Sequence, residues 1–301
     1  MRLRESEIRV IAHKVVAEAG FTSLPIDPKK IAESKDILLQ PWEPKELGIS
    51  GFLMVKGQSV GIGYSTAIKN EGFCNFTISH ELGHYSLDGH IEKLFHNGVE
   101  THFSKSGFVS EDNIEREADI FATELLMPES LFAKALQEAG AGFTTIQKLS
   151  IKGKTSIVAT ALRYAELTDD HVAVIISSGD RVEYMRMSKP IRELRGLARF
   201  KNSDLTIPSN SGTATFNRNP EKIRNAEQTE SSLSLCAWCN SAPDIEIQEE
   251  VIGLGHYGKT LTVLYTNESV DGLNEEDDEE YDCHDNLPSE RWARYDRERR
   301  D

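Results

Sequence analysis

Hydrophobic residues recur at helical spacing through the first half of the chain, and three short extended runs interrupt them. Most of the helical segments end at a glycine or before a proline, as helices commonly do. The extended runs are separated by glycines, which is typical of short strands. The predicted helices cover residues 5–19, 25–33, 73–87, 114–127, 129–140, 144–150 and 155–167, and the predicted strands 37–40, 51–55 and 59–64. A small sheet is therefore expected just before the predicted helix at residues 73–87.

After residue 170 the pattern changes to alternating or continuous apolar runs. Residues 178–180, Ser-Gly-Asp, join the first two runs in a pattern typical of a β-hairpin. Four strands are predicted, at 171–176, 182–187, 245–252 and 260–265. Two polar stretches, 90–113 and 196–232, are predicted to be a loop and a weakly structured insertion. The sequence thus predicts one domain over 1–167, a β-rich domain over 170–270, and a disordered charged tail over 272–301.

The predicted helix at residues 73–87 carries the sequence His80-Glu81-Leu82-Gly83-His84. Two histidines four residues apart point from one face of a helix, so both imidazoles can bind one metal ion. Glu81 lies beside that face and can accept a proton from water activated by zinc. The motif therefore predicts a hydrolytic zinc (Zn²⁺) site with Glu81 as general base. The alternative is an amphipathic helix with two surface histidines.

A zinc hydrolase needs a third protein ligand, and Glu115 is the first candidate. Glu115 begins the helix that carries Ala118 and Ala122 on the same side, so its carboxylate is expected to lean towards the core. Asp119 follows four residues later and can accept a hydrogen bond from the outer nitrogen of a zinc-bound imidazole. Glu117 lies about 200° round the helix from Glu115 and should face elsewhere. A favourable charge at a helix N-terminus is the alternative role of Glu115.

The second candidate is His90, which follows His84 by six residues, as in the extended motif H-E-x-x-H-x-x-G-x-x-H. That motif requires a glycine at the position that Leu87 occupies, so His90 is better interpreted as a loop histidine. His96 and His102 lie in the same loop, and either could orient a substrate or stabilise an oxyanion. Nothing in their spacing indicates a ligand.

The formal net charge is −15, and residues 274–301 supply −7 of it through twelve acidic and five basic side chains. Such a balance argues against non-specific nucleic-acid binding, which requires a concentrated positive face. Residues 128–165, which hold five basic and two acidic side chains, are mildly basic. Their helix pair at 144–167 could form a helix-turn-helix with 155–164 as the recognition helix. Plain helical packing is the simpler interpretation.

The four cysteines do not resemble the disulfide framework of a secreted protein. Cys236 and Cys239 could form half of a structural zinc site completed by Cys283, His256 or His284, but the second C-x-x-C is missing. A reduced pair flanking Trp238 is the alternative. The N-terminus lacks an apolar signal segment, and no stretch is long enough to span a membrane. A cytoplasmic protein is therefore expected.

The residues from Glu115 to Pro128 read E-x-x-A-D-x-F-A-x-x-L-L-M-P, about thirty residues after His-Glu-x-x-His. Together the two blocks resemble the ImmA/IrrE family of metallo-endopeptidases over roughly residues 40–130. The resemblance implies a cytoplasmic zincin-like domain that cleaves a protein, often a helix-turn-helix repressor. It also implies that His80, His84 and Glu115 bind zinc and that Glu81 is the base. The region beyond residue 170 inherits nothing from it.

The sequence therefore predicts an α+β protein: a zincin-like helical domain with a small N-terminal sheet, followed by a β-rich domain that senses a signal or presents substrate. The predicted function is zinc-dependent cleavage of a cytoplasmic protein, a helix-turn-helix repressor, with no membrane partner and with DNA as a less favoured one. Two alternatives use the zincin domain as a scaffold: a DNA-binding regulator acting through 144–167, and a toxin–antitoxin component acting by protein contact.

Overall fold

The computed structural model describes residues 3–44, 48–96, 100–105, 112–194, 197 and 206–266. Within these ranges the chain forms two compact units, one from residues 3–135 with 149–159 and one from residues 136–148 with 160–266. The predicted boundary after residue 167 stays a prediction, since the helices of 144–167 contribute to both units. The predicted tail 272–301, with Cys283 and His284, lies outside the described residues.

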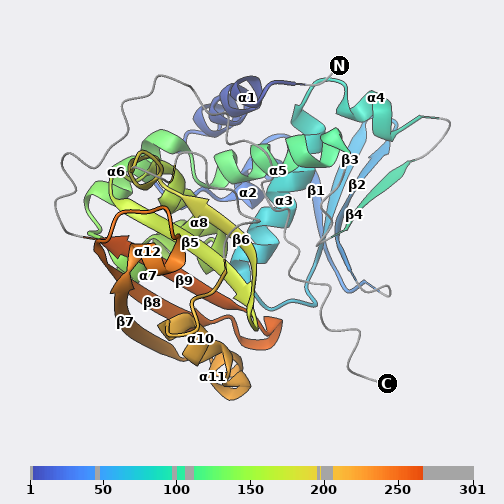
Figure 1. Ribbon diagram of the computed structural model, residues 1–301. Coiled ribbons are helices and arrows are strands. Elements are labelled where there is room, and N and C mark those ends of the chain that lie inside the picture. The colour runs from blue at the N-terminus through green and yellow to red at the C-terminus, as the bar shows by residue number, and fades with distance from the viewer. Residues whose placement is uncertain are drawn as a thin grey trace. The chain divides into compact units, whose positions relative to one another are not determined.

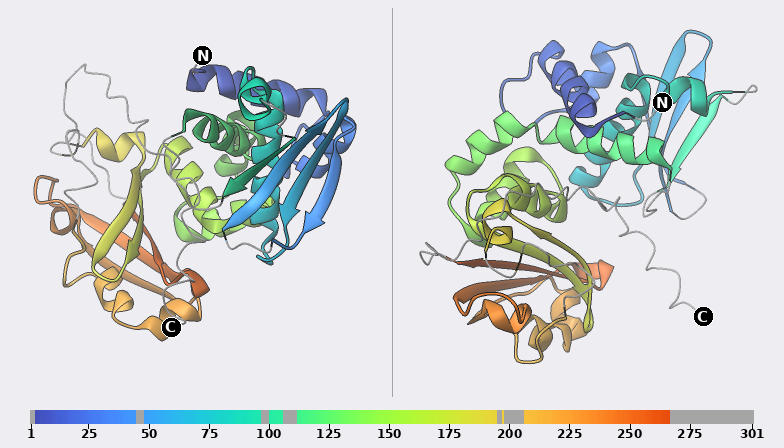
Figure 2. Two further views of the ribbon diagram at one scale, coloured as in Figure 1. Left: turned by 90° about the vertical axis from the view of Figure 1, so that its right-hand side faces the viewer. Right: turned by 45° about the horizontal axis from the view of Figure 1, so that its top comes forward.

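The first unit contains a four-stranded sheet in the order β1-β3-β2-β4. Its strands are β1 (Leu38–Trp42), β2 (Ile49–Lys56), β3 (Ser59–Ser65) and β4 (Thr101–Lys105). β1 and β3 are parallel, and the other pairs are antiparallel. Leu53 and Ile62 pair across β2 and β3, and both are fully buried. One face of the sheet packs against α3 (Glu71–Ser86), as Figures 1 and 2 show.

The tightest helix contact of this unit joins α3 to α5 (Asn113–Leu126). Gly83 makes this contact possible, because a Cβ atom there would lie 3.2 Å from the Cα atom of Ala118. The same α5 packs against α1 (Glu5–Glu18) through the buried Glu124. Its carboxylate accepts a hydrogen bond from Arg9 Nη1 at 2.9 Å and contacts His13 Nε2 at 2.6 Å. Helix α5 is therefore held on two sides, which fixes the direction of its first turn.

The second unit is built on a five-stranded antiparallel sheet in the order β6-β5-β9-β8-β7. Its strands are β5 (His171–Ser178), β6 (Arg181–Met187), β7 (Gln228–Ser234), β8 (Glu246–Gly253) and β9 (Thr260–Thr266). Helix α10 (Gly212–Asn217) packs against β8 and β7 (Figure 1). The buried carboxylate of Glu249 accepts hydrogen bonds from the backbone N–H groups of Gly212 and Thr213, so β8 holds the first turn of this helix, whose N-cap is Ser211.

The remaining helices are short or join the two units in sequence. They are α2 (Pro28–Ser34), α4 (His90–Leu94), α6 (Glu129–Gln137), α7 (Gly142–Gly153), α8 (Ile157–Leu167), α9 (Lys189–Arg192), α11 (Pro220–Arg224), α12 (Leu235–Trp238) and the 3-10 helix η2 (Gly255–Tyr257). The pair α7 and α8 corresponds to the predicted helix-turn-helix. Arg163 of α8 is buried, and its Nη1 lies 3.1 Å from Glu166 Oε1, so this guanidinium does not face solvent.

The α+β class is confirmed, and two local predictions are wrong. The predicted loop 90–113 contains α4 and β4, and the predicted insertion 196–232 contains α10, α11 and β7. β4 has one large apolar side chain, Phe103, and forms because β2 supplies backbone hydrogen bonds along its edge. β7 is also polar and forms in the same way, through backbone pairing with β8, its one neighbour among the described strands. Among the described residues, no helix is both long and apolar enough to cross a lipid bilayer.

Candidate metal centre

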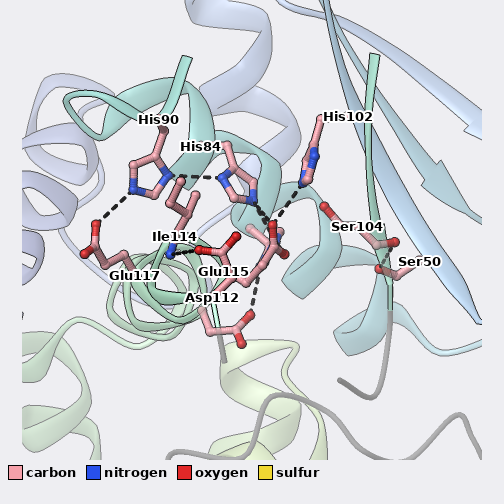
Figure 3. A network of polar contacts seen from close by, with 11 residues as sticks. Ser50, His84, His90, His102, Ser104, Asp112, Ile114, Glu115 and Glu117 are labelled. Atoms are coloured by element: carbon pink, nitrogen blue, oxygen red, sulfur yellow. Dashed lines mark hydrogen bonds and ion pairs between the residues drawn. The ribbon is translucent and has the colours of Figure 1, made fainter. Parts of the chain in front are cut away.

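Helices α3 and α5 bring His80, His84 and Glu115 together. One ligand atom from each lies within 4.8 Å of the other two. The two Nε2 atoms of the histidines are 3.0 Å apart, and Glu115 Oε2 lies 3.2 Å from His80 Nε2. Figure 3 shows the imidazole of His84 and the carboxylate of Glu115 pointing at the same place. Within the described ranges this is the one grouping of histidine, cysteine and acidic side chains that could hold a metal ion.

Helix capping sets the position of both helices locally. The side chain of Asn70 accepts a hydrogen bond from the backbone N–H of Phe73 and begins α3. Asp112 does the same for α5 by accepting from the N–H of Ile114 at 3.1 Å. Both are residue types preferred at helix N-caps. Because α5 begins at residue 113, Glu115 lies in its first turn, opposite the two histidines.

The electrostatic states of His84 and Glu115 suit a divalent cation. Burial lowers the pKa of His84 to about 3, so its imidazole is neutral and has a free lone pair. Burial alone would raise the pKa of Glu115, but hydrogen bonds with His102, His80 and His84 hold it well below its usual range. Two imidazole nitrogens and one carboxylate are also the donor set of catalytic zinc sites that leave one position open. The residues present therefore fit a bound metal ion.

His80 differs from His84 because two carboxylates contact its ring. Burial would lower the pKa of His80, but hydrogen bonds with Asp119 and Glu115 raise it well above its usual range. Asp119 Oδ1 lies 2.8 Å from His80 Nδ1, the nitrogen that faces away from the cluster. This is the place predicted for Asp119, on the outer side of an imidazole ligand, and its role there stays a prediction.

Glu81 is fully buried beside the cluster, and neither of its carboxylate oxygens has a hydrogen-bond partner of normal geometry among the described residues. Burial raises the pKa of Glu81 to about 7. A carboxyl group with a pKa near neutrality can both accept and return a proton at the pH of a cell. The placement of Glu81 thus matches the chemistry predicted for a general base.

Strand β2 leaves room for Glu81 at Gly51. A Cβ atom at this position would lie 2.5 Å from Thr77 Cγ2, 2.8 Å from the Gly63 carbonyl oxygen and 3.1 Å from Glu81 Oε1. We therefore expect Gly51→Ala to lower the free energy of unfolding by about 1–3 kcal/mol, the usual cost of overpacking. Denaturant unfolding of the metal-free protein measures this loss. Gly61→Ala is the matched control, because its Cβ would meet only the Leu38 carbonyl oxygen at 3.7 Å; equal losses in both variants would contradict the proposed close contact.

His102 reaches the cluster from the sheet. It lies on β4, and its Nε2 is 3.0 Å from Glu115 Oε1 (Figure 3). The sequence pattern missed this contact, because β4 was interpreted as part of a loop. The sequence offered little signal for a strand here, because Phe103 is the one large apolar side chain among residues 101–105. His102 therefore contacts a candidate ligand and is not itself part of the three-residue grouping.

His90 lies on the outer side of His84. It is buried on α4, with its Nδ1 3.1 Å from His84 Nδ1 and its Nε2 3.0 Å from Glu117 Oε2. Glu117 thus faces His90 rather than the cluster, as the helix geometry predicted. His96 is exposed and contacts the Lys93 carbonyl oxygen at 2.7 Å.

The cysteines of the C-x-x-C pair are not part of a metal site among the described residues. Cys236 and Cys239 are free thiols. Cys236 Sγ lies 3.1 Å from Ser234 Oγ, and Cys239 Sγ lies 3.1 Å from Ser241 Oγ. The side chain of His256 and the residues Cys283 and His284 lie outside the description, so completion of the predicted zinc site by any of them is not tested.

A histidine-bearing helix packed on one side by a sheet and on the other by a carboxylate-bearing helix is the arrangement that the sequence predicted for a zincin-like domain. Residues 69–147 match the family model described as IrrE N-terminal-like domain, Peptidase_M78, which confirms the resemblance inferred from the motifs. Among solved structures, a Mycobacterium tuberculosis transcriptional regulator is similar in fold, with a TM-score of 0.51 and 12% identity, covering 86% of this chain and 76% of that one. No curated protein matches.

Proposed function

We propose that the chain is a zinc-dependent endopeptidase that cleaves a specific cytoplasmic protein, a helix-turn-helix repressor. The observation that carries this proposal is the convergence of His80, His84 and Glu115 beside the buried carboxylate of Glu81. The match of residues 69–147 to a peptidase family supports hydrolysis of a peptide bond. The repressor as substrate follows from the family resemblance and is the finer part of the proposal.

In this mechanism His80, His84 and Glu115 hold the zinc ion, which when bound polarises the scissile carbonyl and makes water a stronger acid. Glu81 accepts a proton from the attacking water as its oxygen bonds to the carbonyl carbon. The same carboxyl group then gives this proton to the leaving amine nitrogen as the carbon–nitrogen bond breaks. The burial of Glu81 suits both transfers, because in the metal-free site it raises the pKa of this carboxyl group to about 7.

The edge of the first sheet offers a place for the substrate chain. β4 is an end strand in the order β1-β3-β2-β4, so among the described strands only β2 pairs with it. An extended peptide can add to such an edge through main-chain hydrogen bonds. His102 of β4 touches Glu115, and a peptide laid along this strand would therefore pass close to the candidate metal ligands.

Metal removal tests the proposal. A purified helix-turn-helix repressor encoded beside this gene is incubated with the wild-type protein, with protein stripped by a chelator, and with stripped protein given zinc. We expect two defined fragments with the first and third samples and intact repressor with the second. Cleavage that survives stripping would contradict zinc dependence. Salt-sensitive binding to duplex DNA without any cleavage would favour the regulator instead.

A further inference from the structure

The two candidate histidine ligands have different supports on their outer nitrogens. His80 Nδ1 meets a carboxylate directly, at Asp119. His84 Nδ1 meets a second imidazole, His90, whose far nitrogen meets the carboxylate of Glu117 (Figure 3). Glu117 Oε1 in turn accepts a hydrogen bond from the backbone N–H of Leu3 at 3.1 Å. All three side chains of this second arrangement, which we call the His84 relay (His84, His90 and Glu117), are buried.

The hydrogen bonds of the His84 relay allow one arrangement of protons when Nε2 of His84 faces a metal. That nitrogen must then offer its lone pair, so the ring proton is on Nδ1 and is donated to His90 Nδ1. His90 Nδ1 is therefore an acceptor, and the proton of this second ring is on Nε2. From there it is donated to Glu117, whose ionised carboxylate can accept from both His90 and Leu3. Every polar atom in the chain of contacts is satisfied, as buried polar groups usually are.

We propose that His90 is a positioning residue for the metal centre: it fixes the tautomer and ring orientation of His84, and Glu117 fixes those of His90. The inference rests on the proposed metal site. Partners of this kind orient an imidazole ligand and increase its basicity, and their loss weakens metal affinity. A histidine interposed between ligand and carboxylate extends this support to a carboxylate that His84 cannot reach. The six-residue spacing from His84 thus identifies a partner of the ligand rather than a ligand.

Zinc affinity measured by competition with a chromophoric chelator tests this role. We expect His90→Leu, which keeps bulk but removes the acceptor, to weaken zinc binding by about 10–100-fold. His90→Asn places its side-chain oxygen at the position of Nδ1 and should recover most of the affinity. His90→Gln extends its polar atoms towards Glu117 and leaves no acceptor at Nδ1, so it should resemble His90→Leu. His96→Leu, which removes an exposed histidine, is the matched control and should bind zinc as the wild type does.

The relative zinc affinities of the asparagine and glutamine variants test the positioning role of His90 even if the leucine variant fails to fold. Thermal unfolding of the metal-free proteins detects a general loss of packing. Such a loss would lower the unfolding midpoints, but it would not give the asparagine variant a higher zinc affinity than the glutamine variant. Equal zinc affinity in the asparagine and glutamine variants would overturn the positioning role of His90. His80→Ala is measured alongside. If this variant keeps wild-type zinc affinity, the proposed metal site is wrong, and not only the proposed role of His90.

Discussion

Replacing Glu81 with glutamine is expected to lower the rate of substrate cleavage by about 10²–10⁴-fold, the usual contribution of a general acid–base group. Glutamine has nearly the same shape as glutamate, so the fit against β2 at Gly51 should be kept. It cannot accept a proton from water, and it cannot deliver one to the leaving amine. The affinity for zinc should stay close to that of the wild type, because Glu81 is not among the three converging donors.

Single-turnover cleavage of the repressor, followed on gels with zinc in excess, measures this loss. Glu129→Gln is the matched control, because Glu129 is an exposed residue in the first turn of α6. It should cleave at the wild-type rate. If Glu81→Gln cleaves as fast as this control, Glu81 is not the base. Unchanged biological activity of the variant in cells would point to a protein that acts by contact, as a toxin–antitoxin component would.

Replacing Glu115 with alanine is expected to weaken zinc binding by more than about 100-fold, because it removes a direct ligand. Loss of a residue that only supports a ligand usually weakens metal affinity by about 10–100-fold. His80 and His84 alone leave two positions without protein donors, and catalytic zinc sites generally use three protein ligands. The change also removes the acceptor for His102, whose Nε2 lies 3.0 Å from Glu115. Cleavage should be lost with the metal.

Metal content after dialysis against a weak chelator measures the effect, with Glu129→Ala as the control for loss of an exposed carboxylate. Circular dichroism of the same samples shows whether the helices remain. A folded Glu115→Ala protein that retains zinc as the control does would remove Glu115 from the ligand set. The third ligand would then have to be sought elsewhere, and His102, whose ring centroid lies 5.1 Å from that of His84, would be a candidate.

The sequence indicated those parts of the site that depend on the geometry of a single helix. Two histidines four residues apart must share a face of α3, and Glu115 and Asp119 must share a face of α5. The packing of α3 against α5 was predictable only through the family resemblance. The structure adds the physical reason: Gly83 inside the motif leaves the space that Ala118 fills.

The partners missed by sequence analysis are held by contacts between distant segments. His102 approaches Glu115 only because β4 pairs with β2, and residues 101–105 carry too few apolar side chains to indicate a strand. His90 approaches His84 because the chain turns back at Gly89, whose φ of +82° begins α4. From sequence spacing alone, His90 was interpreted as a less favoured alternative ligand. Its burial and its hydrogen bond with Glu117 were not available from any local pattern.

In the second unit, too, the sequence predicted the apolar strands but not a polar strand that forms by pairing with a distant segment. Its apolar strands β5, β8 and β9 were predicted from their composition, whereas the polar β7 was not. β7 is an end strand in the sheet order, and its stability comes from pairing with β8 rather than from buried side chains. Edge strands of this kind have no strong hydrophobic signal.

X-ray diffraction from crystals grown with zinc, recorded above and below the zinc absorption edge, tests the central claim most directly. We predict one anomalous peak between α3 and α5, at about 2.0–2.1 Å from the Nε2 atoms of His80 and His84 and about 2.0–2.2 Å from a carboxylate oxygen of Glu115. A zinc-loaded crystal with no peak among these three side chains, or with the peak on another set of residues, would contradict the account.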